Sequence, residues 1–476
     1  MAGFFIENFG CRAARADGEA VSARLCSTGL DEQSLHDASL VIVNTCSVTA
    51  DADRAARAFI RRAHRRNPEA KIVVTGCYAQ RAPEELAGMA GVAAVVGNSH
   101  KGHAPEIIRN LALGQVPAAV APIVSVSALL RASKHAAAVW VDDRFAHSFI
   151  EDAPLANPAL RQNAQTRPNL KIQEGCGNRC SFCVIPFTRG PSKSLSRAVI
   201  LRQVEGFVEA GGKELVLSGI NLGRWGRELP GAERDTLPHL VRAILEKTAL
   251  PLLRLSSIEP MDWDDELIAL MREFGESGAG RPRLARHAHL PLQSGSDAVL
   301  RRMHRRYRPW HYAEKFAALV RTAGPDLTVG ADVMAGFPAE TDREFEETLG
   351  FIRALPFGYL HLFPFSPRPG TAAWSLHAAS PVPQAIVDER MAVLRAVAAE
   401  KTHAHRSRLI GRTLPSITLH TPPGLAALGR TAALTDNFIP VELDGTLPAN
   451  HLMPIEVTAL NGDGTLVGNR KPVESI

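Results

Sequence analysis

The sequence predicts a mixed α/β protein with an N-terminal parallel-sheet domain, an incomplete (β/α)6 barrel and a small C-terminal β-barrel. Three observations lead to this prediction. Apolar strand-like runs alternate with helical segments in residues 1–120, six further strand-plus-helix units follow from residue 166, and short alternating runs separated by turn residues fill the last part of the chain.

The composition limits the class of protein but does not identify its function. Of the 476 residues, 45% are hydrophobic and 22% charged, as in ordinary globular proteins, and the formal net charge of +5 allows an anionic partner such as RNA without requiring one. The seven cysteines are an odd number in a long chain, which favours a reducing, cytoplasmic setting. We expect no signal peptide, since the first apolar run is too short, and no membrane span, since no stretch approaches ~18 apolar residues.

Three apolar runs of the N-terminal domain each end in a cysteine. They cover residues 4–11, 40–46 and 71–77 and end in Cys11, Cys46 and Cys77. Because parallel strands share one C-terminal edge, where open α/β sheets bind ligands, we expect the three thiols to converge there. The alternative is that they are buried small hydrophobes, as free cysteine often is.

Helices are predicted between these strands at Asp17–Gly29 and Ala50–Arg66, the second ended by Asn67-Pro68. Cys26 then lies within the first helix and is interpreted as a packed thiol. The second helix carries six arginines that are either a solvated basic face or phosphate contacts, at positions 54, 57, 61, 62, 65 and 66. Residues 115–165 are rich in Ala, Pro and Ser and predict a loose connector with a strand or two, not a separate domain.

A second set of cysteines lies in the run Cys176-Gly-Asn-Arg-Cys180-Ser-Phe-Cys183. Thiolates suit iron–sulfur clusters, zinc or Cu(I). A structural zinc site needs four ligands, and no fourth Cys or His is near, whereas three ligands on a four-iron cluster leave one iron open for chemistry. A broken zinc site or three packed thiols remain as alternatives.

The stretch from Lys171 to Gly190, with these cysteines followed by Pro186 and Arg189, resembles the cluster motif of radical S-adenosylmethionine (SAM) enzymes, and more narrowly that of the methylthiotransferase family. The resemblance implies a 4Fe–4S cluster on Cys176, Cys180 and Cys183 whose open iron binds the amino and carboxylate groups of SAM.

The strings Asn44–Thr49 and Gly76–Gln80 also resemble this family. They imply a second, auxiliary 4Fe–4S cluster on Cys11, Cys46 and Cys77. One departure is Ala14, where the family usually has Asn three residues after the first cysteine, so the hydrogen bond that such an Asn would make near the cluster is in doubt.

The barrel is predicted from six strand-like runs, at residues 170–173, 214–221, 252–259, 287–293, 327–336 and 358–363. An incomplete TIM-like barrel has its active site where the strands end, and polar residues are expected at those ends: Asn221, Glu259, Gln293 and Asp332. Each alone would be a loop cap, but as a set they are expected to help hold SAM. Gly219 would allow close backbone approach, and Phe182 would shield the cluster, stack on adenine or simply pack.

Further strings resemble methylthiotransferase signatures, at residues 218–226, 256–260, 289–295 and 336–341. The Gly219-Ile-Asn-Leu-Gly223 form is most similar to the branch acting on threonylcarbamoyladenosine in tRNA. Ala339 stands where the family usually has Gly. Five arginines after the Gln293 strand are expected to face solvent, with RNA contact as a minority reading, at positions 301, 302, 305, 306 and 308.

A linking helix over Asp388–Leu409 precedes alternating runs at Leu414–Leu419, Phe438–Leu443 and Leu452–Leu460. This tail resembles a TRAM domain, an RNA-binding barrel, although a β module without RNA contact would have the same pattern. The expected domains are thus 1–120 (methylthiotransferase domain), 121–165 (connector), 166–400 (radical SAM core) and 401–476 (TRAM-like domain).

The resemblance implies a cytoplasmic, monomeric tRNA-modifying enzyme that uses two 4Fe–4S clusters and SAM. It would methylthiolate the adenine of threonylcarbamoyladenosine next to the anticodon through a SAM-derived radical, with electrons from a flavodoxin- or ferredoxin-type donor. Two alternatives stay open: the same chemistry on isopentenyladenosine or a ribosomal protein, and an RNA-binding protein with structural metal and no turnover.

Overall fold

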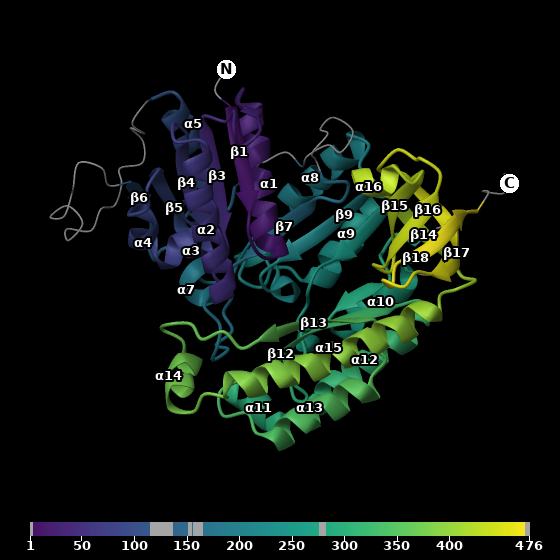
Figure 1. Ribbon diagram of the computed structural model, residues 1–476. Coiled ribbons are helices and arrows are strands. Elements are labelled where there is room, and N and C mark those ends of the chain that lie inside the picture. Colours follow the sequence, from purple (N-terminus) through teal and green to yellow (C-terminus); the bar gives the residue numbers. More distant parts are fainter. Residues whose placement is uncertain (1–2, 115–136, 151–154, 156–164, 276–281, 472–476) are drawn as a thin grey trace. The chain divides into compact units, whose positions relative to one another are not determined.

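The computed structural model describes residues 3–114, 137–150, 155, 165–275 and 282–471 (Figure 1). The chain divides into two compact units, which are described separately. The first comprises Met1–Leu155, Gln173–Ser194 and Ser366–Thr371, and the second comprises Ala156–Ile172, Leu195–Phe365 and Ala372–Ile476.

The first unit is built on a parallel sheet of order β2-β1-β3-β4-β5-β6. Its strands are β1 (Gly3–Asn8), β2 (Asp31–Glu32), β3 (Leu40–Thr45), β4 (Lys71–Gly76), β5 (Val92–Gly97) and β6 (Ala138–Trp140). Residues of β3 are buried at every position because helices cover both faces of the sheet, as parallel sheets require.

Successive residues of β3 serve opposite cores. Leu40 and Ile42 pack with α1 (Arg12–Ser27) and α5 (Ala104–Ala112), whereas Val41 and Val43 pack with the other helices. Those helices are α2 (Ala50–Arg66), α3 (Cys77–Arg81) and α4 (Pro83–Ala87). The sheet is therefore a rigid platform whose strand ends stay at one edge.

The predicted helix Ala50–Arg66 is confirmed at both ends, and Thr49 caps it by accepting a hydrogen bond from the Ala52 amide at 3.3 Å. The helix predicted at Asp17–Gly29 begins earlier, at Arg12, because Gly10 at φ +104° turns the chain straight from strand to helix. Cys26 lies in its last turn and is half-buried. The α2 arginines form an exposed basic face, with Arg57 half-buried.

The second unit contains the predicted strand-plus-helix units. The strands are β7 (Asn169–Glu174, of which the first four residues belong here), β9 (Glu214–Gly219), β10 (Leu252–Leu255), β11 (His287–His289), β12 (Thr328–Ala335) and β13 (Tyr359–Pro364). β9 lies between β7 and β10 and pairs in parallel with β10, and β11, β12 and β13 pair in parallel in that order. A parallel bridge between Leu253 and Leu284 connects β10 to the segment before β11. The expectation that Asp332 ends its strand is wrong, because β12 continues three residues further, to Ala335.

Helices alternate with these strands: α8 (Arg197–Glu209), α9 (Leu237–Lys247), α10 (Asp265–Glu273), α11 (Asp297–Arg302), α12 (Pro309–Ala323) and α13 (Asp342–Ala354). This alternation confirms the predicted mixed α/β core. The short α14 (Ala372–Ala379) and the long α15 (Gln384–Ser407) follow.

The C-terminal segment forms a closed barrel in the order β14-β15-β16-β18-β17. Its strands are β14 (Thr413–Thr418), β15 (Arg430–Thr435), β16 (Pro440–Asp444), β17 (Leu452–Leu460) and β18 (Leu466–Arg470). The predicted small barrel is confirmed, but only three of its five strands were expected from the sequence, and β15 and β18 were not among them. Within the second unit the barrel is held to the core by Arg286, whose guanidinium binds the Asp436 carboxylate through two hydrogen bonds of 2.6 and 2.9 Å.

The predicted connector at 121–165 lies largely outside the described residues. None of the helices in the described ranges is both long and apolar enough to cross a membrane.

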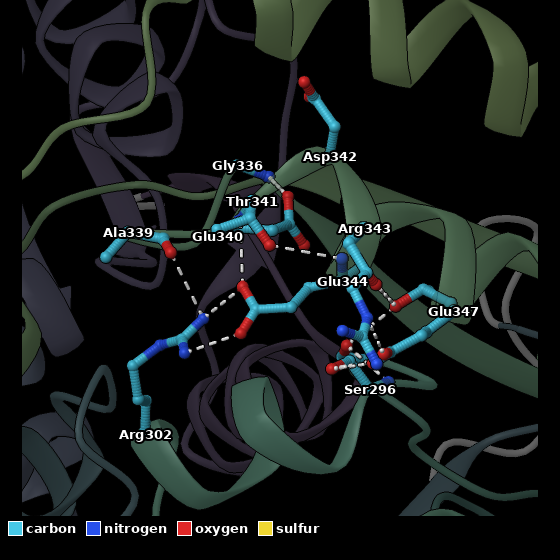
Figure 2. A network of polar contacts seen from close by, with 12 residues as sticks. Ser296, Arg302, Gly336, Ala339, Glu340, Thr341, Asp342, Arg343, Glu344 and Glu347 are labelled. Carbon is cyan, nitrogen blue, oxygen red and sulfur yellow. Dashed lines mark hydrogen bonds and ion pairs between the residues drawn. The ribbon is translucent and has the colours of Figure 1, made fainter.

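The string Gly336–Thr341 connects β12 to α13 and forms the start of that helix. Thr341 and Glu344 form a reciprocal capping box at the start of α13, and Arg302 binds the Glu344 carboxylate with two hydrogen bonds of 2.7 and 2.8 Å (Figure 2). Glu340 accepts hydrogen bonds from the Gly336 amide and from Arg390. Ala339, between these groups, has φ +60°.

We expect the substitution Ala339→Gly to stabilise the protein by about 1 kcal/mol, because a side chain at positive φ strains the backbone and glycine does not. The shift in the midpoint of unfolding measures it. The matched control is Ala331→Gly in β12, where φ is not positive and the same change should destabilise. Equal shifts of the unfolding midpoint in the two variants would contradict backbone strain at Ala339.

His405 gives the second unit a defined pH dependence. Its ring is buried against β12, where Nε2 lies 2.9 Å from the Thr328 hydroxyl, and burial followed by the charges of Arg408 and Arg406 lowers its pKa to about 4. The unfolded chain binds a proton near pH 6.5, so stability is full above that pH and is lost progressively as the pH falls towards 4.

We therefore expect His405→Gln to flatten the loss of stability between pH 7 and pH 4, an effect of about 3 kcal/mol at most. Unfolding midpoints at several pH values test this. The control, His403→Gln on the exposed side of α15, should keep the wild-type slope.

Candidate functional site

The first cysteine set lies at the C-terminal edge of the first unit's sheet. Cys11 precedes α1, Cys46 follows β3 and Cys77 opens α3 directly after β4. Cys46 and Cys77 are buried and Cys11 is exposed. Burial, and then the proximity of Cys77 and Cys11, raises the pKa of the Cys46 thiol to about 12. The three thiols are thus electrostatic neighbours, gathered from three strand ends as the sequence analysis expected.

Two glycines make this gathering possible. A Cβ on Gly10 would lie 2.6 Å from the Cys46 sulfur, and a Cβ on Gly76 would lie 2.3 Å from the Thr45 carbonyl oxygen. Both residues also have positive φ, so a side chain at either position would push the strand ends apart.

The second cysteine set belongs to the same compact unit. Cys176, Cys180 and Cys183 occupy the loop between β7 and the short helix α7 (Ile185–Arg189). The loop is closed by a hydrogen bond from the Cys176 amide to the Gly190 carbonyl at 3.1 Å. All three thiols are partly exposed, so they are accessible to a cofactor.

Neither cysteine set has the close sulfur spacing of a preformed site for one metal ion. Among the described residues, neither cysteine set brings its three sulfur atoms within 4.8 Å of one another. A single tetrahedral zinc ion with Zn–S bonds of ~2.3 Å would hold them about 3.8 Å apart. A multi-iron cluster spreads its thiolates over different irons and needs wider spacing. The donor set, three thiols in each of two groups, consists of the soft ligands that iron–sulfur clusters take.

A buried charge cluster connects the two cysteine sets. Arg189, at the end of α7 and fully buried, donates from Nε to the Cys77 sulfur at 3.2 Å, from Nη1 to Glu174 at 2.6 Å and from Nη2 to Asp17 at 3.1 Å. Lys101 forms an ion pair with Asp17 and lies 3.9 Å from Glu174. Burial acts to lower the pKa of Arg189, but Cys77, Glu174 and Asp17 outweigh it and raise the pKa well above its usual value. The arginine is therefore a permanent cation beside a thiol ligand.

Asn98 makes a second connection. Its side-chain amide donates to the Thr188 carbonyl at 2.7 Å and lies 3.4 Å from the Cys77 sulfur. The helix that follows the second cysteine set is thus anchored on residues around the first set.

Sequence reasoning missed this cluster. Glu174 and Arg189 lie in the stretch that resembles the radical SAM motif but had no predicted role, and no role was predicted for Asp17, Asn98 or Lys101. A signal was present, since Asp17 falls among the small apolar residues of a covered helix and Glu174 ends a fully buried strand. Ala14 is buried and its carbonyl accepts a hydrogen bond from Asn44, while the side chains that donate to the Cys77 sulfur are those of Arg189 and Asn98.

The expected SAM residues fall in both units. Phe182 is half-buried in the cysteine loop of the first unit. In the second unit, Gly219 ends β9, Asn221 is buried just beyond it, and Gln293 follows β11 with φ +64°. Glu259 accepts a hydrogen bond from Arg305 at 2.5 Å. Their contact with SAM stays a prediction.

Two expectations about charged side chains need correction. Arg305 does not face solvent: it is buried, because the Glu259 carboxylate pairs with it, and Arg302 is drawn in by Glu344. Asp332, inside β12, is flanked by His289 and His361. Burial acts to raise the pKa of Asp332, but the two imidazoles outweigh it and hold the pKa well below the usual range.

Family models match both the region that contains the first cysteine set and the region that contains the second. Residues 3–97 match the family model described as "Uncharacterized protein family UPF0004", and residues 170–352 match that of the Radical SAM superfamily. A curated relative from Aquifex aeolicus, named threonylcarbamoyladenosine tRNA methylthiotransferase MtaB, is 32% identical over 92% of this chain and 96% of its own.

A relative from Erythrobacter litoralis, named tRNA-2-methylthio-N(6)-dimethylallyladenosine synthase, is 32% identical over 97% of this chain and 96% of its own. Among solved structures, the radical SAM methyltransferase TsrM from Kitasatospora setae aligns with a TM-score of 0.57 at 15% identity, covering 79% of this chain and 77% of that one. This last similarity concerns the fold alone.

Removal of the buried guanidinium tests the charge cluster. We expect Arg189→Met to destabilise the protein by roughly 3–5 kcal/mol, because Asp17 and Glu174 keep their buried charges and lose their main partner. Iron retained per chain should fall as well, because Cys77 loses a hydrogen-bond donor. Unfolding midpoints and iron analysis of anaerobically reconstituted protein provide the measurements.

A second change separates charge from packing. Addition of Glu174→Gln to Arg189→Met should recover part of the lost stability, since one unpaired carboxylate is removed. Arg15→Met, exposed on the same helix as Asp17, should change stability by no more than ~0.5 kcal/mol. A double variant as unstable as the single one would argue against the ion-pair explanation.

Proposed function

Because this chain belongs to the radical SAM methylthiotransferase family, we propose that it is the enzyme that adds a methylthio group to the adenine ring of threonylcarbamoyladenosine next to the anticodon of tRNA. The observation that carries the proposal is the pair of cysteine sets in one compact unit, connected through Arg189. An enzyme that forms a carbon–sulfur bond needs one centre for the radical and another for the sulfur.

The enzyme uses SAM and two 4Fe–4S clusters. We assign one cluster to Cys176, Cys180 and Cys183, whose three ligands leave an iron open for SAM, and the auxiliary cluster to Cys11, Cys46 and Cys77. When bound, these cofactors supply the radical chemistry at an unactivated C–H bond and the sulfur that is transferred.

The side chains position and shield the cofactors. Burial of Cys46 and Cys77 keeps water from one side of the auxiliary site, and the Arg189 cation offsets negative charge beside it. Gly219, Asn221, Glu259, Gln293 and Phe182 are our candidates for contacts with SAM.

We assign the recognition of tRNA to the basic and C-terminal parts of the chain. The α2 arginines form an exposed cationic face suited to phosphates, and the closed barrel of residues 413–470 is the candidate TRAM-like RNA-binding domain. The domains proposed remain 1–120, 121–165, 166–400 and 401–476. The target base must leave its stack to be modified. A cytoplasmic location, a monomeric state and a flavodoxin- or ferredoxin-type electron donor complete the proposal.

The second candidate substrate is isopentenyladenosine in tRNA. It is favoured by the dimethylallyladenosine relative, whose identity to this chain equals that of the threonylcarbamoyladenosine relative. The Gly219–Gly223 string favours the threonylcarbamoyl branch. A ribosomal protein as target and a non-catalytic RNA binder have no comparable support.

Mass spectrometry of tRNA nucleosides from a deletion strain decides between the substrates. We expect the methylthio form of threonylcarbamoyladenosine to disappear and the isopentenyl form to persist. Complementation with wild type and with Cys26→Ala should restore the product, whereas Cys46→Ala and Cys176→Ala should leave it at the deletion level. Loss of only the isopentenyl product would transfer the assignment to the second candidate.

A further inference from the structure

One face of the β11-β12-β13 sheet is polar and aromatic, although the opposite face is apolar. The parallel register pairs His289 with Gly330, Gly330 with Tyr359 and Asp332 with His361, so these side chains share one face. The alternate positions are the apolar ones, namely Ala288, Val329, Ala331, Val333, Leu360 and Leu362. Three neighbouring strands thus present two imidazoles and a carboxylate side by side.

These side chains converge on one point. His289 Nε2 and His361 Nδ1 lie 3.3 and 3.4 Å from the same oxygen, Oδ1 of Asp332, and the three atoms are all within 4.8 Å of one another. A tetrahedral ion with bonds of 2.0–2.1 Å separates its ligand atoms by about 3.3 Å. No other trio of His, Cys, Asp or Glu in the described ranges meets this spacing.

The burial of His289 is a second, independent observation. Its side chain is only 8% exposed, and the Nε2 atom that faces Asp332 is enclosed without a hydrogen bond of acceptable geometry. The nitrogen thus lies enclosed beside the Asp332 carboxylate without a well-aligned hydrogen bond, and an ion bound between the two atoms would satisfy both. His361 is 49% exposed, which leaves one side of the group open.

Tyr359 holds the two imidazoles in place. Its ring lies 6.0 Å from that of His289 and 5.0 Å from that of His361, and its hydroxyl is 2.8 Å from His287 Nε2. The ring lies over Gly330, where a Cβ would come within 2.0 Å of the tyrosine. The absence of a side chain at residue 330 therefore sets the position of the tyrosine, and the tyrosine supports both potential ligands.

We propose that His289, Asp332 and His361 form a binding site for a divalent first-row metal ion such as Zn²⁺, separate from the two cysteine sets. Two imidazoles and one carboxylate suit such ions, and three protein ligands leave a coordination position for an exogenous oxygen. The open side at His361 is where that oxygen enters.

The open position suggests a role that rests on the proposed function. Threonylcarbamoyladenosine carries a carboxylate and isopentenyladenosine does not, so an ion in this site would bind the first nucleoside and give no such contact to the second. The ion would then favour the first nucleoside over the second through the carboxylate alone.

Zinc binding to the holoenzyme tests the site. Anaerobically reconstituted protein is dialysed against Zn²⁺, and zinc and iron are counted per chain. We expect one zinc in addition to the iron, held at least tenfold more weakly in His361→Gln and Asp332→Asn and unchanged in His420→Gln, an exposed histidine of the same unit. Iron content and the unfolding midpoint of each variant show whether it is folded.

X-ray absorption at the zinc edge identifies the ligands without interference from iron. Nitrogen and oxygen neighbours at ~2.0–2.1 Å with the pattern of two imidazoles would support the site, whereas sulfur neighbours at ~2.3 Å would place the zinc on cysteines and overturn it. Equal zinc affinity in all variants would overturn it too.

The role in substrate choice has its own readout. Zinc should tighten the binding of the nucleoside N6-threonylcarbamoyladenosine at least tenfold and leave that of N6-isopentenyladenosine unchanged, with the gain absent in His361→Gln. If zinc leaves the affinity for N6-threonylcarbamoyladenosine unchanged, the bound ion does not contact the carboxylate of this nucleoside. The methylthiotransferase assignment is judged separately, by the nucleosides of the deletion strain.

Discussion

The first unit depends on the charge of one buried side chain. Arg189 is enclosed on all sides, and it contacts a strand-end thiol, a helix carboxylate and a strand carboxylate at once. Two carboxylates without this cation would be buried charges paired with Lys101 alone, a state that costs several kcal/mol. The sheet edge, α1 and the second cysteine loop are therefore held in one arrangement by the same guanidinium.

That arrangement matches what the cofactors require. Clusters and SAM carry the difficult chemistry, so the chain has to hold sulfur ligands at set positions and keep solvent away. Gly10 and Gly76 let three strand ends approach, and the helices on both faces make the edge rigid. The charged and polar groups around Cys77 then set the electrostatic surroundings of one ligand.

In the second unit, buried ion pairs and hydrogen bonds attach the small β-barrel to the larger core. Arg286 and Asp436 form a buried two-bond ion pair, and Arg254 donates to the carbonyls of Thr435 and Asp436 while it pairs with Glu214. Such directional contacts fix the orientation of the closed barrel on the core strands. The face of β11, β12 and β13 also brings together His289, Asp332 and His361, a grouping that the sequence motifs do not predict.

The sequence by itself determined the fold class, the helix Ala50–Arg66, the three strands that lead to the first cysteine set, the six strands of the core and both cysteine sets. These features are local, because the periodicity of strands and helices and the spacing of the thiols depend only on residues that are close together in the sequence. Only the tertiary structure decided that Arg189 contacts Cys77, that Arg305 is buried by Glu259, and that Asp332 lies between two histidines. Each of these contacts joins residues that are far apart in the chain, and a side chain's partner depends on strand order and register, which no single segment of sequence specifies.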